Sequence, residues 1–402
     1  MSAEKVIELN RSFLSGPLVV FSVILISVLP ITISLLFLGL IAFFSVDRKD
    51  SGALFISLLF LQALVAALLS NSYPITSDIE SYREYYNQIV DLTFGIEIIY
   101  PTLVSIARGG DIPFNVFTFL VSMVGYCIIF FIVYKMFGRS YFAVIAILLI
   151  SVFPILIYRQ VFLIRQYIGA IFFFLCLVSL WQNKRQLSLI FMVLSVLSHF
   201  SYVIFAWIYI QRIVNLLSHR RVSTILLLAA VLFPFSIDDI LSFLSFVGFD
   251  LPYVIARKIS YYSGEVLAAS VSVFKPMYIF SLLPLLMFLC LDEGSRAERG
   301  NKILGAITLF SCILLMFFRD VSILSGRLAF FLSIFSPLIA CIFINQYKIH
   351  NRQIVVSGYT LLVVVYFVAW VNQNDLGLTS LVLADGDLAG FSVSEGLMNL
   401  TR

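Results

Sequence analysis

The chain has 402 residues, of which 61% are hydrophobic and only 12% are charged. Soluble domains average about 45–50% apolar and about 25% charged residues, so the composition excludes an ordinary soluble domain and indicates an integral membrane protein. The formal net charge is +4, and the cations are spread over many short segments, which argues against a nucleic-acid-binding surface.

Apolar stretches recur along the whole chain and predict membrane-spanning helices. About 17–25 apolar residues cross the hydrocarbon core as an α-helix, which satisfies its own backbone hydrogen bonds. We therefore predict an all-α, polytopic fold that forms one membrane domain over residues 1–402. The predicted spans number about eleven: 17–45, 52–70, 114–134, 140–157, 161–181, 187–211, 222–236, 276–291, 303–318, 328–346 and 354–371.

The loops between these spans alternate in charge. Short loops rich in Lys and Arg stay in the cytoplasm, and they lie at 48–49, 135–139, 184–185, 212–221, 296–302 and 348–352. The opposite side is expected to receive two longer loops at about 71–113 and 238–275, a short turn near residue 319, and the tail 371–402.

The span 187–211 conflicts with this alternation, because basic loops flank it on both sides. A straight helix would place those loops on opposite sides of the membrane. We predict instead a broken helix that enters, turns near residues 198–201 and returns; a tilted single span with a weaker charge bias is the alternative. Irregular backbone at membrane depth is tolerated where protein or water surrounds it, so the break also indicates a cavity.

The first long external loop contains two predicted elements. Residues 77–92 predict a helix outside the membrane, because tyrosines and an isoleucine recur there at helical spacing. A shorter apolar piece, 96–106, is a candidate to dip into the membrane interface.

Two Arg-Gln pairs interrupt an apolar run in YRQVFLIRQYIGAIFFF, residues 158–174. An arginine at bilayer depth costs about 2.5–3.5 kcal/mol on insertion scales, so it usually faces a partner or a wet cavity. Arg159 lies close enough to the external boundary to reach water, whereas Arg165 lies about 9 Å further along a continuous helix. On such a helix Arg159 aligns with Gln166. A wide anionic ligand such as a diphosphate suits these residues, because guanidinium groups fork onto phosphate oxygens.

Three side chains are candidates for proton transfer. His199 lies at the predicted helix break, although a lone histidine is equally well a satisfied core residue. Asp78 opens the external helix and has a capping role as its alternative. Glu97 lies in an apolar setting where desolvation fits a carboxyl group for proton transfer, or it is an interfacial carboxylate in water.

Two further arginines are candidates for anion binding. Arg319 is followed by Asp320, and together they are equally well a surface ion pair of little energetic weight. Arg327 begins the next predicted span and is the better candidate. The five cysteines show no metal-like spacing, and no metal site is expected.

Several segments, in order, resemble the landmarks of the EpsG-like branch of bacterial Wzy-type polysaccharide polymerases. They are SDIESYREYY, GIEIIYPTLVSI, FLIRQYIGA, VLSHFSYVIF and SGRLAFF, between about residues 70 and 345. The resemblance implicates Asp78, Tyr82, Glu97, Arg165, Gln166, His199 and Arg327. The sequence departs from the pattern in the additional Arg159-Gln160 pair and in the absence of a tyrosine after the late arginine.

The resemblance implies a fold similar to the GT-C glycosyltransferases and the activity of an O-antigen polymerase. Such an enzyme transfers a growing glycan from undecaprenyl diphosphate onto the next lipid-linked repeat unit at the periplasmic face of the bacterial inner membrane. We expect no cofactor and no nucleic-acid partner; the expected partners are the lipid-linked oligosaccharide, membrane lipid and a chain-length regulator.

The residues are expected to divide the work of this reaction. The diphosphate would be held by arginines with help from a glutamine, namely Arg159, Arg165, Gln166 and Arg327. The base would be His199, Asp78 or Glu97, among which the sequence does not decide. Two other functions stay open: a lipid-linked oligosaccharide flippase or other transporter, against which the lack of internal repeats argues, and a membrane acyltransferase with a histidine base.

Overall fold

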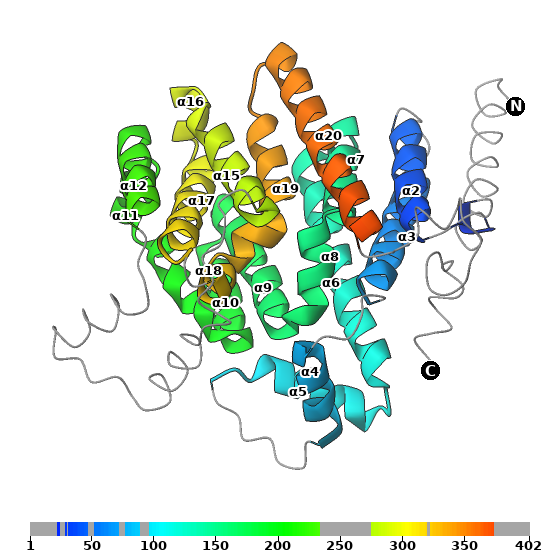
Figure 1. The fold of residues 1–402 in the computed structure, drawn as a ribbon. Helices are drawn as coiled ribbons and strands as arrows, with labels where there is room; N and C mark the ends of the chain where they lie inside the picture. Colours follow the sequence, from blue (N-terminus) through cyan, green and yellow to red (C-terminus); the bar gives the residue numbers. More distant parts are fainter. Residues whose placement is uncertain are drawn as a thin grey trace, which may run out of the picture. The chain divides into compact units, whose positions relative to one another are not determined.

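The computed structural model describes residues 22–24, 29, 31–46, 52–71, 77–88, 96–233, 275–319 and 322–373, and all regular elements in these ranges are helices (Figure 1). Within them, five helices are long and apolar enough to cross a membrane, or up to seven spans if each of two bent pairs counts as one. Four more apolar helices have 10–17 residues. The all-α, polytopic membrane fold is thus confirmed, while the total of about eleven spans stays a prediction.

The chain divides into two compact units. Unit 1 consists of Met1–Ile171 and Ile349–Arg402, and unit 2 consists of Phe172–Lys348. Of the predicted external segments, residues 72–76, 89–95, 238–274 and 374–402 lie outside the described residues.

Unit 1 is a helical bundle around α3. Its helices are α2 (Ile31–Ser45), α3 (Gly52–Asn71), α4 (Ser77–Gln88), α5 (Ile99–Gly109), α6 (Phe114–Phe137), α7 (Tyr141–Ser151), α8 (Pro154–Phe162), the beginning of α9 (Ile164–Trp181) and α20 (Ile349–Gln373). Helix α3 packs against α2, α6 and α8, and α20 packs against α7 and α8. Figure 1 shows α4 and α5 together at one end of α6. Predicted site residues lie on or next to these two helices: Tyr82 is on α4, and Glu97 lies just before α5.

The helix path around the two Arg-Gln pairs differs from the prediction. Helices α7 and α8 are bent by 54°, because Pro154 begins α8 and favours an extended Phe153 (φ −82°, ψ 108°). A second interruption, at Leu163 (φ −122°, ψ 52°), separates α8 from α9. Arg159 and Arg165 therefore lie on different helices, and the predicted alignment of Arg159 with Gln166 on one helix was wrong.

Unit 2 is built around α17 and α19. Its helices are the rest of α9, then α10 (Arg185–Ser198), the 3₁₀ helix η1 (Phe200–Tyr209), α11 (Gln211–Leu217), α12 (Arg220–Leu232), α15 (Pro276–Leu289), α16 (Glu293–Ala297), α17 (Arg299–Phe317), α18 (Ser322–Leu328) and α19 (Phe330–Ile344). All 15 residues of α19 are buried, as expected for a helix that is apolar on every face. Helix α17 packs against α11, α12, α15 and α19.

The predicted break near residue 199 is confirmed. Helix α10 ends at Ser198, and His199 is extended (φ −155°, ψ 120°) before η1 begins. The Ser188 hydroxyl near the start of α10 lies 2.7 Å from the Tyr209 hydroxyl at the end of η1, so the second arm returns to where the first began. Fourteen residues of α10 extend about 21 Å, less than the roughly 30 Å of a hydrocarbon core. Residues 185–209 therefore form a helical hairpin, the His199 hairpin, with His199 at its tip.

Candidate functional site

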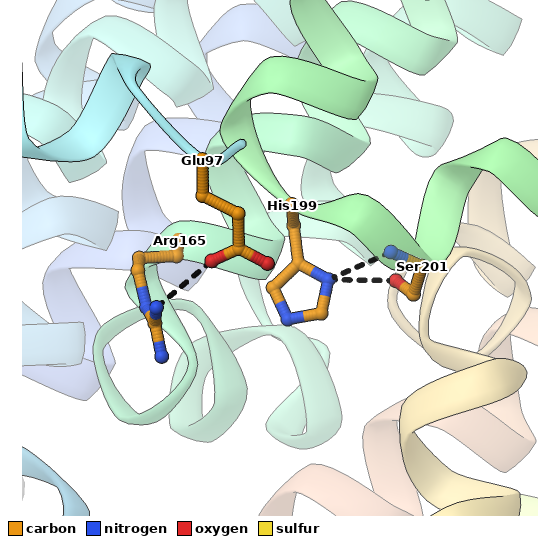
Figure 2. Close-up of polar contacts among 4 residues, drawn as sticks. All are labelled: Glu97, Arg165, His199 and Ser201. Carbon is orange, nitrogen blue, oxygen red and sulfur yellow. Dashed lines mark hydrogen bonds and ion pairs between the residues drawn. The ribbon is translucent and has the colours of Figure 1, made fainter. Parts of the chain in front are cut away.

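Three predicted site residues from distant parts of the chain meet in unit 1. Arg165, the second residue of α9, places Nη1 2.8 Å from Oε2 of Glu97 (Figure 2). Its guanidinium carbon lies 5.6 Å from the centroid of the Tyr82 ring on α4. We call Tyr82, Glu97 and Arg165 the Arg165 cluster. Its ion pair and cation–π contact fix the guanidinium from two directions.

Aromatic packing positions α4, which carries Tyr82, and α5, which follows Glu97 in the chain. The Tyr100 ring of α5 lies 5.5 Å from that of Tyr82 and 6.0 Å from that of Tyr85, both on α4. Tyr100 is 1% exposed and also packs against Phe117 of α6, at 6.1 Å. Burial raises the pKa of the Tyr100 hydroxyl well above its ordinary value, so Tyr100 stays neutral and acts as a packing residue.

The Arg165 cluster is accessible to a ligand. The side chains of Arg165 and Glu97 are 42% and 23% exposed, respectively. A guanidinium has five N–H donors, and the ion pair with Glu97 occupies the Nη1 end. An exposed guanidinium held at one end can still offer donors to phosphate oxygens, so the ion pair orients the cation without enclosing it.

The other predicted residues of unit 1 take different positions. Arg159 is half-buried on α8, beside Tyr366 of α20. Gln166 is 2% exposed and points into the helix packing, away from the exposed side of α9 where Arg165 lies. Asp78 is the second residue of α4, and its side chain lies outside the described part of the structure.

In unit 2, His199 is held by a residue that the sequence did not single out. Its Nδ1 accepts the backbone N–H of Ser201 at 3.3 Å and lies 2.7 Å from the Ser201 hydroxyl (Figure 2). A backbone N–H is always a donor, so Nδ1 must carry a lone pair, and we assign the ring proton to Nε2. In this form His199 presents a hydrogen-bond donor at Nε2. The sequence signal that could have indicated this contact is a serine two residues after the histidine, in the first turn of the helix η1.

The late arginines also belong to unit 2. Nη1 of Arg319 donates to the carbonyl oxygen of Val231 at 3.0 Å, which ties the end of α17 to α12. Asp320, its predicted partner, lies outside the described residues. Arg327 is half-buried in the last turn of α18.

Metal ligation has no support in the described ranges, where no group of three or more His, Cys, Asp or Glu side chains could hold a metal ion. The expectation of metal-independent chemistry stays a prediction.

Comparison with known protein families matches residues 53–381 to the EpsG family. The chain belongs to the EpsG family. The matched range contains the Arg165 cluster, the His199 hairpin and both late arginines. Membership of the EpsG family confirms the resemblance carried by the sequence landmarks and indicates a membrane protein of the polysaccharide-polymerase type. No curated protein and no solved structure matches the chain.

Proposed function

We propose that this EpsG-family protein is a glycosyltransferase that polymerises an O-antigen or a related glycan. It would transfer the growing chain from undecaprenyl diphosphate onto the next lipid-linked repeat unit, at the periplasmic face of the inner membrane. The observation that carries the proposal is Arg165, a fixed and accessible cation in the first turn of a membrane-spanning helix.

The chemistry explains why a fixed cation is needed. The acceptor hydroxyl oxygen attacks the anomeric carbon, the bond between that carbon and the diphosphate oxygen breaks, and its electron pair stays on the diphosphate. Negative charge therefore grows on the leaving group as the reaction proceeds. A guanidinium already held in place by Glu97 and Tyr82 opposes that charge without having to reorient, so it stabilises the transition state more than the ground state.

The acceptor's proton would go to a carboxylate. His199 with its ring proton on Nε2 is a donor at that nitrogen, which favours hydrogen bonding to an anion over proton abstraction. Glu97 and Asp78 are the remaining candidates for the base, and Glu97 is the one in contact with Arg165.

The other predicted residues have supporting roles in the proposal. Arg159 and Arg327 would add positive charge for the diphosphate. Gln166, which is buried on α9, would help to orient the diphosphate. Arg319 donates to a backbone carbonyl, which favours a structural role over substrate binding.

The decisive test compares two arginines that have similar surroundings. Arg165→Lys keeps the charge but loses the fork geometry, and Arg165→Ala removes both. Arg83 of α4 provides the matched control, because it also lies over an aromatic ring, that of Phe114 at 5.7 Å, and also bonds a polar side chain, donating to Asn115 Oδ1 at 3.2 Å.

The variants would be purified, reconstituted and incubated with a defined lipid-linked repeat unit and no nucleotide. We expect a glycan ladder from the wild type and from Arg83→Lys, and a loss of about 10²- to 10³-fold in rate for Arg165→Ala. Thermal unfolding confirms that each variant is folded. A normal ladder from folded Arg165→Ala, or passage of the substrate across the bilayer with no ladder from the wild type, would refute the proposal.

A further inference from the structure

Helix α5 exposes an apolar face. Ile98, at its N-terminal boundary, is 38% exposed, and Ile106 near its end is 67% exposed, with Thr102 exposed between them. Successive positions four apart lie on one side of a helix, so these residues form a stripe. Ile96, just before the helix, is 58% exposed. We call Ile98 and Ile106, on one side of α5, the isoleucine face.

Helix α4 lies beside α5 but has a different outer surface. The two helices contact each other through aromatic rings: the buried Tyr100 ring is 6.0 Å from that of Tyr85, which is itself 38% exposed. The exposed positions of α4 include Glu80, Glu84 and Asn87, whereas α5 has no acidic residue and a single basic one, Arg108, in its last turn. The outer surface of α4 is thus suited to contact with water. The outer surface of α5 is suited to the membrane interface, where acyl chains lie next to phosphate headgroups.

Helix α5 is also held close to the membrane by its connection. It ends at Gly109, and α6, a 24-residue span, begins at Phe114. The connecting turn is fixed by hydrogen bonds from the Ile112 N–H to the Ala107 carbonyl at 3.0 Å and from the Tyr86 hydroxyl to the Ile112 carbonyl. Because the turn is short and tied down, α5 stays beside the end of a span (Figure 1).

We propose that α5 is an interfacial helix whose isoleucine face is covered by the lipid bilayer. Ile98 and Ile106 lie among the acyl chains next to the start of α6, and Arg108 lies among the phosphate headgroups. The apolar face leaves water, which is the driving force for this placement.

This placement has a consequence for the Arg165 cluster. Glu97 stands between Ile96 and Ile98 in the chain and contacts Arg165. A lipid-bound isoleucine face therefore keeps the ion pair at headgroup depth, where the diphosphate of a membrane-anchored polyprenyl substrate also lies. This consequence rests on the proposed function; the contact with lipid does not.

Photocrosslinking tests the lipid contact without substrate or activity. Benzoylphenylalanine would be introduced singly at Ile106, at Asn87 on the polar side of α4, and at Leu361, which is 65% exposed on the span Asn351–Val371. Each variant would be placed in phosphatidylglycerol–phosphatidylethanolamine nanodiscs, irradiated and analysed by intact mass spectrometry. We expect lipid adducts at positions 106 and 361, and a several-fold lower yield at position 87.

Two outcomes overturn the inference: a lipid-adduct yield at position 106 as low as that at 87, or crosslinks from 106 to protein in place of lipid. Thermal unfolding verifies that each variant is folded, and a second probe at Ile98 replaces position 106 if that variant does not fold. Should the ladder assay fail while position 106 crosslinks to lipid, the proposed function falls and the interfacial helix stands.

Discussion

Gly125 of α6 permits the close approach of α9, the helix that carries Arg165. A Cβ atom at this position would lie 2.2 Å from the Tyr167 hydroxyl oxygen and 2.6 Å from Cδ1 of Ile171. Tyr167 is 0% exposed, so its ring is surrounded by other side chains and cannot swing out into solvent. Small residues allow membrane helices to pack at such short range. We therefore expect Gly125→Ala to push α6 and α9 apart.

The size of the effect follows from these distances. Overpacking a core costs about 1–3 kcal/mol, and a contact of 2.2 Å favours the upper half of that range. Alanine recovers about 0.8–1.0 kcal/mol of helix propensity over glycine. The net destabilisation is thus about 1–2 kcal/mol, measured as a lower midpoint of thermal unfolding by circular dichroism in detergent. Because Arg165 is two residues before Tyr167, the ladder assay should also show a slower rate at temperatures where the variant is folded.

Two further variants test the cause of this destabilisation. Tyr167→Phe removes the nearest atom, and that hydroxyl is buried with no hydrogen-bond partner in the part of the chain that is described, so Tyr167→Phe alone should cost little and should rescue part of Gly125→Ala. Gly358→Ala in α20 is the control, because a Cβ there meets nothing within 4 Å, and it should be neutral or slightly stabilising. An unchanged unfolding midpoint for Gly125→Ala, or no rescue by Tyr167→Phe, would refute the packing argument.

Three other predictions follow from single contacts. Tyr209→Phe removes the hydroxyl that lies 2.7 Å from that of Ser188. We expect the free energy of unfolding to fall by about 0.5–1.5 kcal/mol and proteolysis within residues 185–209 to become faster. Adding Ser188→Ala to this variant should give no additional loss of stability. Ser201→Ala keeps the backbone N–H that donates to His199 Nδ1, so ¹⁵N NMR of labelled histidine should still show the Nε2–H form; a ring protonated at Nδ1 would contradict the assignment. Gly305→Ala would place a Cβ 2.3 Å from a phenylalanine ring of α15, and a midpoint of unfolding equal to that of the wild type would show that α15 and α17 pack less closely than the structure indicates.

The fold and its hairpin were predictable because their signals are local in the sequence. Long apolar runs can satisfy their backbone in lipid only as helices, which determines the all-α class. Basic loops on both sides of 187–211 favoured a helix that turns back, and the hydrogen bond between Ser188 and Tyr209 shows that the second arm returns to the start of the first. The bend between α7 and α8 also has a local signal, Pro154, although the predicted span 140–157 ran through it.

The break between α8 and α9 was predicted only approximately. The predicted spans 140–157 and 161–181 leave a gap at 158–160, whereas the helix is interrupted at Leu163, where neither glycine nor proline stands. The sequence singled out Tyr82, Glu97 and Arg165 separately, by charge and by family landmarks, but not as partners. Glu97 and Arg165 are 68 residues apart in the chain.

The sequence by itself determined the class of fold, the helix break at His199 and which polar residues are unusual for a membrane. Only the tertiary structure decided that Arg165 meets Glu97 and Tyr82. Periodicity and charge bias act along the chain and can be recognised from neighbouring residues. The partner of a guanidinium depends on how α4, α5 and α9 pack, and that packing is the joint result of many distant side chains, including the aromatic contacts around Tyr100.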